Sequence, residues 1–199
     1  MALTLFDFDG TLTTRDTFRS FLRFAIPTPR MLAGGLLLSP LLVGHQLGLV
    51  SSAQARPWLS WAGFVGVSAR RMRVLGERFA AQELPGAINV EMLARFEAHK
   101  TRGDTVYVVS AGLEPYLRPW CQAHGVGLVC TELEERGGVL TGRYRRGDCS
   151  GPNKAAFVRA DIGLARFDEI VAYGDTAEDL DMLALAHRRF FRGVEQHGS

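Results

Sequence analysis

The chain has 199 residues, which is enough for one compact domain or for one domain that carries a modest insertion. Hydrophobic residues make up 47% of it and charged residues 22%, which excludes disorder of the chain as a whole. The formal net charge is only +2, so the composition does not indicate a nucleic-acid binder that relies on phosphate contacts.

The cysteines and the first residues bear on the compartment. Cys121, Cys130 and Cys149 are odd in number and irregular in spacing, which argues against a disulfide framework, and no CxxC pair suggests zinc. We expect reduced, partly buried thiols. The amino-terminal residues show no basic region and no signal-peptide pattern, so we expect a cytoplasmic protein, with a peripheral position at the inner membrane as a further option.

The first half of the chain predicts one strand followed by helices. Residues 2–8 are a short apolar run that ends in acidic residues, which is typical of a buried strand with its functional end at the carboxyl side. From about residue 16 to residue 99 the composition favours helices, in which Phe18, Phe21 and Leu22 fall on one face.

Residues 31–50 contain no Asp, Glu, Lys or Arg and are long enough to be considered as a membrane span. Pro40 in the middle and several glycines argue against a span, which would also separate the first strand from the rest of its sheet. Two interpretations stay open. The segment forms two apolar helices, broken near Pro40, that pack in a cap, or it forms an apolar surface that touches a bilayer or a second subunit of a homodimer.

Strands and helices alternate in the second half of the chain. In chain order we predict a strand at 106–110, a helix at 113–124, a hairpin over 130–144, a helix at 153–161, a strand at 170–173, a helix at 177–186 and a last strand at 189–192. This alternation predicts an α/β fold, with a mostly parallel, Rossmann-like sheet that has helices on both faces. Residues 1–14 and 100–199 would form the core, and residues 15–99 an inserted helical cap.

Two aspartates follow the first strand, in the sequence Asp7-Phe8-Asp9-Gly10-Thr11. The chain leaves the strand through Gly10, and we expect the two carboxylates to converge on one site at the end of the sheet, where ligands bind in such folds. Paired carboxylates repel each other and therefore favour a divalent cation, and hard oxygen ligands favour magnesium. The alternative is a plain acidic turn, which the full pattern in this position argues against.

Other polar residues follow later strands. Ser110 ends the second predicted strand, where a hydroxyl and free backbone amides would bind an oxyanion, although serine is common there. Lys154 lies at a helix start, against the macrodipole preference, which makes sense if it faces a phosphate or a carboxylate rather than solvent. Asp175 could complete a metal site and Asp179 could brace the lysine or a metal-bound water, the alternative being a turn that caps a helix.

In this order the four elements resemble the motifs of the haloacid dehalogenase superfamily. Residues 7–11 match DxDx[TV], Ser110 and Lys154 match the second and third motifs, and residues 174–179 match GDxxxD. A helical insertion after the first motif is similar to the phosphoserine-phosphatase-like subclass, which has a small cap. Residues 16–21 and the apolar stretch after them resemble the bacterial phosphatidylglycerophosphatase C group.

The resemblance implies a magnesium-dependent phosphomonoester hydrolase that acts through an aspartyl-phosphate intermediate. Asp7 would be the nucleophile, and Asp9 the general acid and then the general base. The Asp7 carboxylate, the Asp9 backbone carbonyl and Asp175 would hold Mg²⁺, while Ser110 and Lys154 would bind phosphate oxygens. Alternatives are a phosphotransferase with an alcohol acceptor, a membrane-surface lipid phosphatase such as one acting on phosphatidylglycerophosphate, and a non-catalytic interaction protein.

The substrate, a small-molecule or lipid phosphomonoester, is less well defined by the sequence. Thr11, Ala111 and Gly112 would shape the loops that bind it. Asp16 stands where phosphoserine phosphatases have a glutamate that meets the substrate ammonium, so it either contacts the substrate or caps the next helix. The cap arginines Arg56, Arg70 and Arg71 either meet an anionic head group or are solvated surface charges.

Overall fold

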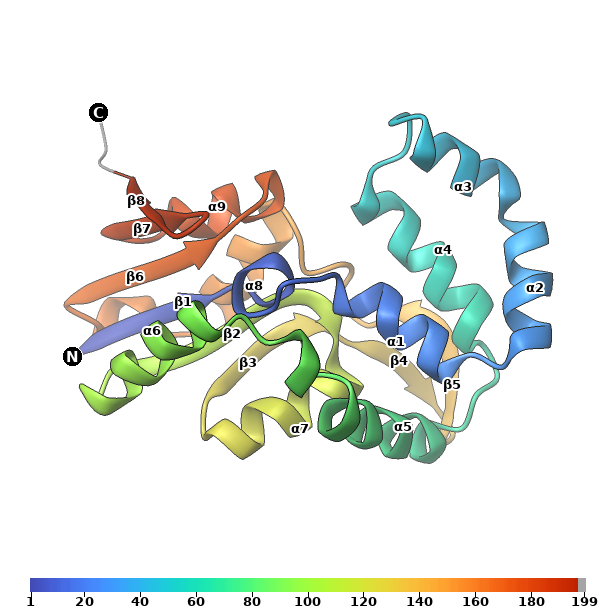
Figure 1. The fold of residues 1–199 in the computed structure, drawn as a ribbon, viewed down its shortest axis with the longest axis horizontal. Coiled ribbons are helices and arrows are strands. Elements are labelled where there is room, and N and C mark those ends of the chain that lie inside the picture. The colour runs from blue at the N-terminus through green and yellow to red at the C-terminus, as the bar shows by residue number, and fades with distance from the viewer. Residues whose placement is uncertain (197–199) are drawn as a thin grey trace.

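The computed structural model describes residues 1–196 and confirms the α/β fold with its mainly parallel sheet (Figure 1). Six strands lie in the order β3-β2-β1-β6-β7-β8, and all neighbours are parallel except β7 and β8. The strands are β1 (Ala2–Phe6), β2 (Thr105–Leu113), β3 (Gly127–Thr131), β6 (Glu169–Gly174), β7 (Arg188–Phe191) and β8 (Val194–Gln196). The parallel strands therefore direct their carboxyl ends to one edge.

Alternating side chains of the central strand bury themselves on opposite faces of the sheet, because successive residues of a strand point to opposite sides. Leu3 and Leu5 of β1 share one apolar cluster with residues of α8 (Pro152–Asp161) and α9 (Leu180–Leu183). Phe6 belongs to the other cluster and meets Phe96 of α6 (Val90–Thr101) in an edge-to-face contact, with ring centroids 5.4 Å apart. The helix α7 (Glu114–His124) packs on this same face.

The remaining helices extend beyond the carboxyl edge of the sheet, on the right in Figure 1. They are α1 (Thr17–Ala25), α2 (Thr28–Leu37), α3 (Ser39–Gln46), α4 (Ser52–Phe64) and α5 (Ala69–Gln82). The two-stranded sheet of β4 (Leu133–Arg136) and β5 (Val139–Tyr144) lies beside α4, and α5 packs on α7. The helix α6 lies on the sheet itself. The division into a core of 1–14 and 100–199 and a cap of 15–99 stays a prediction.

The apolar stretch folds as two helices that meet at Leu38, two residues before Pro40. This agrees with the interpretation of a broken helical pair, because proline fits the first turn of α3 and could not continue α2. Within residues 1–196, none of the helices has the length and apolar character needed to cross a membrane.

The structure differs from the sequence prediction mostly in short elements. The strand β3 was missed because it is short and its last two residues were assigned to the predicted hairpin, which in fact begins at Leu133. The strand β8 was also missed. The helix predicted at 177–186 is a tight turn at Ala177–Asp179 followed by the four-residue α9. The turn forms because the Asp179 carboxylate accepts hydrogen bonds from the backbone ahead of it.

The three cysteines are free and buried, and burial raises the pKa of the Cys121 and Cys149 thiols to about 12 and that of Cys130 well above its usual value. Since the thiolate is the reactive form, we expect negligible alkylation by iodoacetamide at pH 7.5 in the folded protein and labelling of all three thiols in urea. Mass spectrometry of both samples checks this, and rapid labelling of the native protein would contradict the buried placement.

Candidate active site

Polar side chains from three strand ends meet in one cavity. Asp7 follows β1, Ser110 lies near the end of β2 and Asp175 follows β6, and all three line a cavity of about 940 Å³. Residues of α1 to α4 form its opposite wall. The cavity therefore lies outside the carboxyl ends of the parallel strands, where the topology of the sheet predicts a ligand site.

A buried ammonium joins two of the aspartates. Lys154 Nζ lies 2.5 Å from Asp7 Oδ1 and 2.5 Å from Asp179 Oδ1, and all three side chains are almost fully buried. Burial alone would lower the pKa of Lys154, but the two carboxylates outweigh it and raise that pKa above its usual value. Lys154 is therefore a fixed positive charge beside Asp7.

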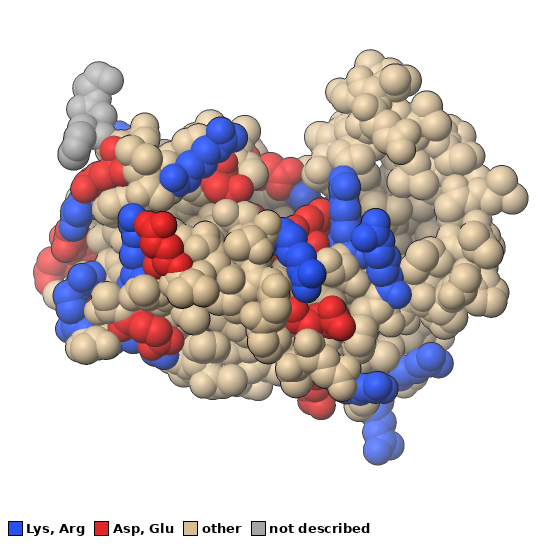
Figure 2. Space-filling view, viewed as in Figure 1, with Lys and Arg blue, Asp and Glu red and all other residues tan. Residues whose placement is uncertain are grey.

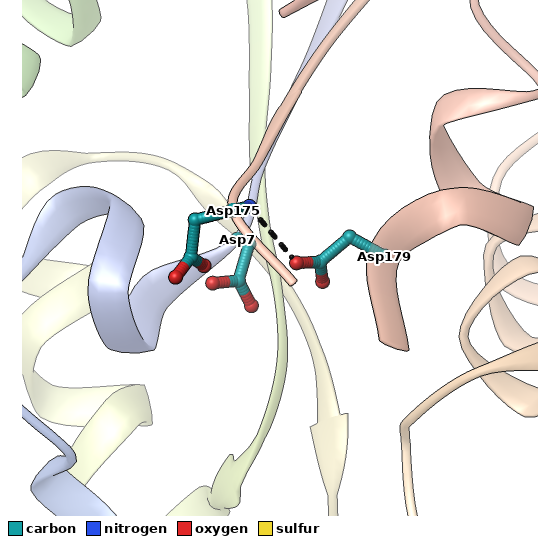
Figure 3. A group of neighbouring side chains, drawn as sticks. All are labelled: Asp7, Asp175 and Asp179. Atoms are coloured by element: carbon teal, nitrogen blue, oxygen red, sulfur yellow. Dashed lines mark hydrogen bonds between the residues drawn. The ribbon is translucent and has the colours of Figure 1, made fainter. Parts of the chain in front are cut away.

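Three carboxylates lie close enough together to share a metal ion (Figure 3). One oxygen each of Asp7, Asp175 and Asp179 lies within 4.8 Å of the others, and the Asp175 backbone N–H donates to Asp179 Oδ2 at 3.1 Å. Burial raises the pKa of Asp7 well above its usual value despite the nearby Lys154, and it also raises the pKa of Asp175. The close grouping of three carboxylates with hard oxygen donors fits a divalent cation such as Mg²⁺.

The first motif loop approaches Asp175 through a glycine. Gly10 has φ +87°, and a Cβ atom added there would lie 2.3 Å from Asp175 Oδ2. Only glycine allows both this backbone conformation and this close approach. Thr11 then donates a hydrogen bond to Asp175 Oδ1 at 3.2 Å. The loop thus fixes the position of a carboxylate that comes from a distant part of the chain.

Asp9 lines the cavity, but its side chain lies outside the group of three carboxylates. Its Oδ1 accepts hydrogen bonds from the backbone N–H of Thr17 at 2.9 Å and from the Thr17 hydroxyl at 2.5 Å. Burial raises the pKa of Asp9 to about 6, against the lowering effect of these hydrogen bonds. The carboxyl of Asp9 can therefore exchange a proton near neutral pH.

The second motif lies in the last residues of β2, where the register of pairing with β3 shifts between Ser110 and Leu113. The buried Ser110 Oγ accepts a hydrogen bond from the Gly112 N–H at 2.9 Å, and Ser110 and Ala111 line the cavity. A Cβ atom on Gly112 would lie 2.5 Å from the Tyr116 hydroxyl, so this position has no room for a larger residue. The prediction that Gly112 shapes a loop fits this contact.

Asp16 lies at the start of α1, where its Oδ1 accepts the backbone N–H of Arg19 at 2.9 Å. Its other oxygen is 3.1 Å from the Arg19 guanidinium. The structure thus favours the capping alternative for Asp16, although this residue also lies at the cavity wall.

Arg56 is a site residue whose role the sequence did not reveal. It reaches from α4 to the far side of the cavity, where it contacts Asp148 through two hydrogen bonds of 2.9 Å and Glu178 through one of 2.7 Å. Its side chain is only 13% exposed, so the interpretation of a solvated surface charge is wrong for Arg56, whereas Arg70 and Arg71 are exposed. No sequence signal could have found this cluster, because its acidic partners lie 92 and 122 positions away.

Comparisons with known proteins place the chain in a family. The model of the haloacid dehalogenase-like hydrolase family matches residues 4–184. The chain therefore belongs to this family, which confirms the superfamily resemblance seen in the motifs. It is also 30% identical to Protein CicA of Caulobacter vibrioides, over 96% of this chain and 87% of that protein.

Solved structures share the fold. A Bordetella pertussis Tohama I protein of unknown function has a TM-score of 0.77 at 24% identity, over 94% of this chain and 88% of that chain. A probable phosphoserine phosphatase from Vibrio cholerae has a TM-score of 0.68 at 18% identity, over 96% of this chain and 55% of that chain. These likenesses confirm the phosphoserine-phosphatase-like fold. The looser resemblance to the phosphatidylglycerophosphatase C group stays a prediction.

Removal of the Arg56 guanidinium should destabilise the protein, because Asp148 would keep a largely buried charge without its ion-pair partner. We expect Arg56→Met to lower the free energy of unfolding by about 3 kcal/mol in urea titrations. The matched control is Arg71→Met, which removes an exposed arginine and should cost about 0.5 kcal/mol or less. Equal stability of the two variants would show that the cluster contributes nothing.

The raised pKa of Asp9 should make the stability of the protein depend on pH. Asp9 has a pKa of about 6 in the folded protein and its usual pKa, near 4, in the unfolded chain. Between these two values the folded protein binds more protons than the unfolded chain, so the contribution of Asp9 to stability decreases as the pH rises through this interval. Asn at this position keeps an oxygen that accepts both Thr17 hydrogen bonds but carries no charge. We expect Asp9→Asn to raise the free energy of unfolding of the metal-free protein, more at pH 7.5 than at pH 5. Urea titrations at both pH values measure this, and an equal change at both pH values would contradict it.

Proposed function

We propose that this protein is a magnesium-dependent phosphomonoester hydrolase that acts through an aspartyl-phosphate on Asp7. The observation that carries the proposal is the position of Asp7, which lines the cavity and is in contact with Lys154 and near Asp175. A carboxylate nucleophile beside a fixed ammonium is arranged to meet an anionic phosphate. Membership of the hydrolase family supports this assignment.

The Asp7 carboxylate, Asp175 and the backbone carbonyl of Asp9 would hold Mg²⁺, and Asp179 would position Lys154 and the backbone of Asp175. A bound magnesium ion would neutralise the repulsion between the Asp7 carboxylate and the incoming phosphate. Lys154 and the irregular end of β2 at Ser110 and Ala111 would bind the phosphate oxygens and stabilise their charge during transfer.

Proton transfer falls to Asp9. An oxygen of Asp7 attacks phosphorus, the ester bond breaks, and the protonated Asp9 gives its proton to the departing alkoxide. A water then attacks the aspartyl-phosphate while Asp9 takes up its proton, which releases phosphate and restores Asp7. A pKa of about 6 suits both steps, because acid and base forms of Asp9 are both accessible near neutral pH. The hydrogen bonds from Thr17 hold the carboxyl in place.

The composition of the cavity wall indicates which class of substrate fits. Opposite the aspartates, α1 and α4 contribute apolar residues, among them Leu22, Ile26 and Leu59. Asp16, which was expected to meet a substrate ammonium, instead accepts the backbone N–H of Arg19 at the start of α1. A leaving group with an apolar part therefore suits this cavity better than phosphoserine does.

Phosphate release tests the proposal directly. We expect turnover with Mg²⁺, none with EDTA, and a loss of about 10³-fold or more in Asp7→Asn, which lacks the nucleophile. The panel is phosphoserine, phosphoethanolamine, sugar phosphates and lysophosphatidate, with added alcohols to detect phosphoryl transfer to an acceptor other than water. Asp181→Asn, which changes an exposed aspartate of α9, is the matched control and should keep full activity. Activity that survives in Asp7→Asn would overturn the mechanism.

A further inference from the structure

The helices α2 and α3 present an apolar face that no other part of residues 1–196 covers. Both lie within the described residues, and neither contains a buried side chain. Along this pair and the turn after it, six aliphatic side chains are between 53% and 80% exposed: Leu32, Leu36, Leu37, Val43, Leu47 and Leu49. We call these six residues the outer face. Figure 2 shows the lobe around α3, at the upper right, in tan alone. Exposed apolar patches of this kind mark interaction sites.

The stretch of sequence that carries the outer face has charged residues of one sign only. Residues 17–76 contain seven arginines and no aspartate, glutamate or lysine, whereas the rest of the chain has an excess of acidic residues. Three of these arginines, Arg19, Arg23 and Arg30, line the cavity where it borders α1 and α2. Arg19 and Arg56 are paired with acidic residues of the same or neighbouring elements, which leaves Arg23 and Arg30 as the basic side chains beside α2 that bear on this face. An apolar face next to these two arginines is complementary to a surface that is apolar inside and anionic at its boundary.

The same two helices also contribute to the wall of the active-site cavity. Met31, Leu38 and Leu42 lie on the inner side of α2 and α3 and line the cavity, while the outer face points away from it. The helix pair thus presents apolar side chains on both sides, with Arg30, His45 and Gln46 as polar members of the inner side. An apolar chain bound in the cavity would contact the inner side of α2 and α3.

We propose that the outer face docks on the surface of an anionic lipid bilayer and that the cavity takes a lipid phosphomonoester from it. The second part rests on the proposed function, and the first part does not. With 10 and 8 residues, α2 and α3 are about 15 and 12 Å long, so they would lie in the interface rather than cross a hydrocarbon core of about 30 Å. The arginines would meet the anionic head groups.

A second copy of the chain fits this face less well. A symmetric dimer would bring the same patch of both copies together, and with it two arginine-rich segments of like charge. It would also bring a protein surface to the helices that border the cavity mouth. A bilayer avoids both conflicts, because its head groups are of opposite sign and its lipids are the source of the ligand.

Flotation with vesicles tests the docking. We expect the wild-type protein to float with vesicles of equal parts phosphatidylglycerol and phosphatidylcholine, and to float less with phosphatidylcholine alone or at high salt. The double variant Leu36→Glu, Leu47→Glu puts two charges on the outer face without changing a residue that lines the cavity, and we expect it to lose about tenfold or more in vesicle partition.

The matched control adds the same charges elsewhere. Val90→Glu, Val194→Glu changes two exposed valines, of which Val90 is as exposed as Leu36 at 80%, and should float like the wild type. Thermal melting followed by circular dichroism verifies that both double variants are folded. A wild-type protein that stays at the bottom of the gradient, or a control that loses binding equally, overturns the docking proposal. A dimer in sedimentation that only Leu36→Glu, Leu47→Glu dissociates, without vesicle binding, assigns the face to a second copy.

A variant of the nucleophile distinguishes catalysis from docking. Asp7→Asn should float as the wild type does and release no phosphate from lysophosphatidate in the vesicles. If the wild-type protein floats but hydrolyses no ester of the panel, the proposed function fails and the docking surface stands. If it hydrolyses soluble esters but neither floats nor acts on the lipid, the proposed function stands and the lipid inference is wrong.

Discussion

The ion pair between Lys154 and the two aspartates Asp7 and Asp179 is the contact on which the site depends. A buried ammonium is costly unless it is paired, and Lys154 is paired twice at 2.5 Å. The three partners come from the end of β1, from α8 and from the turn after β6, so their mutual contact fixes three separate chain segments at one point. The Asp179 carboxylate extends this order, because its other oxygen accepts the backbone N–H groups of residues 175 and 176.

This arrangement leaves the site short of positive charge. One ammonium faces the carboxylates of Asp7 and Asp179, while Asp175 lies beside them and has a raised pKa. Burial of charged carboxylates costs stability in the folded chain, and a bound cation would offset that cost. The same reasoning applies to Asp9, whose burial makes it a weaker acid than usual and therefore a usable proton donor. The burial that raises the pKa values of these aspartates therefore lowers the stability of the folded chain, and the same burial suits the site to phosphate chemistry.

The sequence predicted those parts of the site that depend on local patterns. The aspartates and Ser110 follow apolar runs, and parallel strands bring such ends to one edge, so their meeting could be foreseen. The break before Pro40 could be foreseen because proline ends a helix. Arg56 could not, because its ion pairs join residues far apart in the chain and arginine is usually exposed. Nor could β3, because a five-residue strand leaves too short a pattern to separate from the hairpin beside it.

The two sides of the helical wall of the cavity are held in place to different degrees. The helix α4 is tied to the loop before α8 and to the turn after β6 through Asp148 and Glu178, so one side of the cavity wall is anchored by charge. The pair α2 and α3 on its other side has no buried residue and is held by far less apolar contact. Motion at the cavity mouth should therefore fall on α2 and α3, because local opening follows the elements with the least buried surface. A bilayer that covers these two helices would stabilise them in the position in which the cavity receives its ligand.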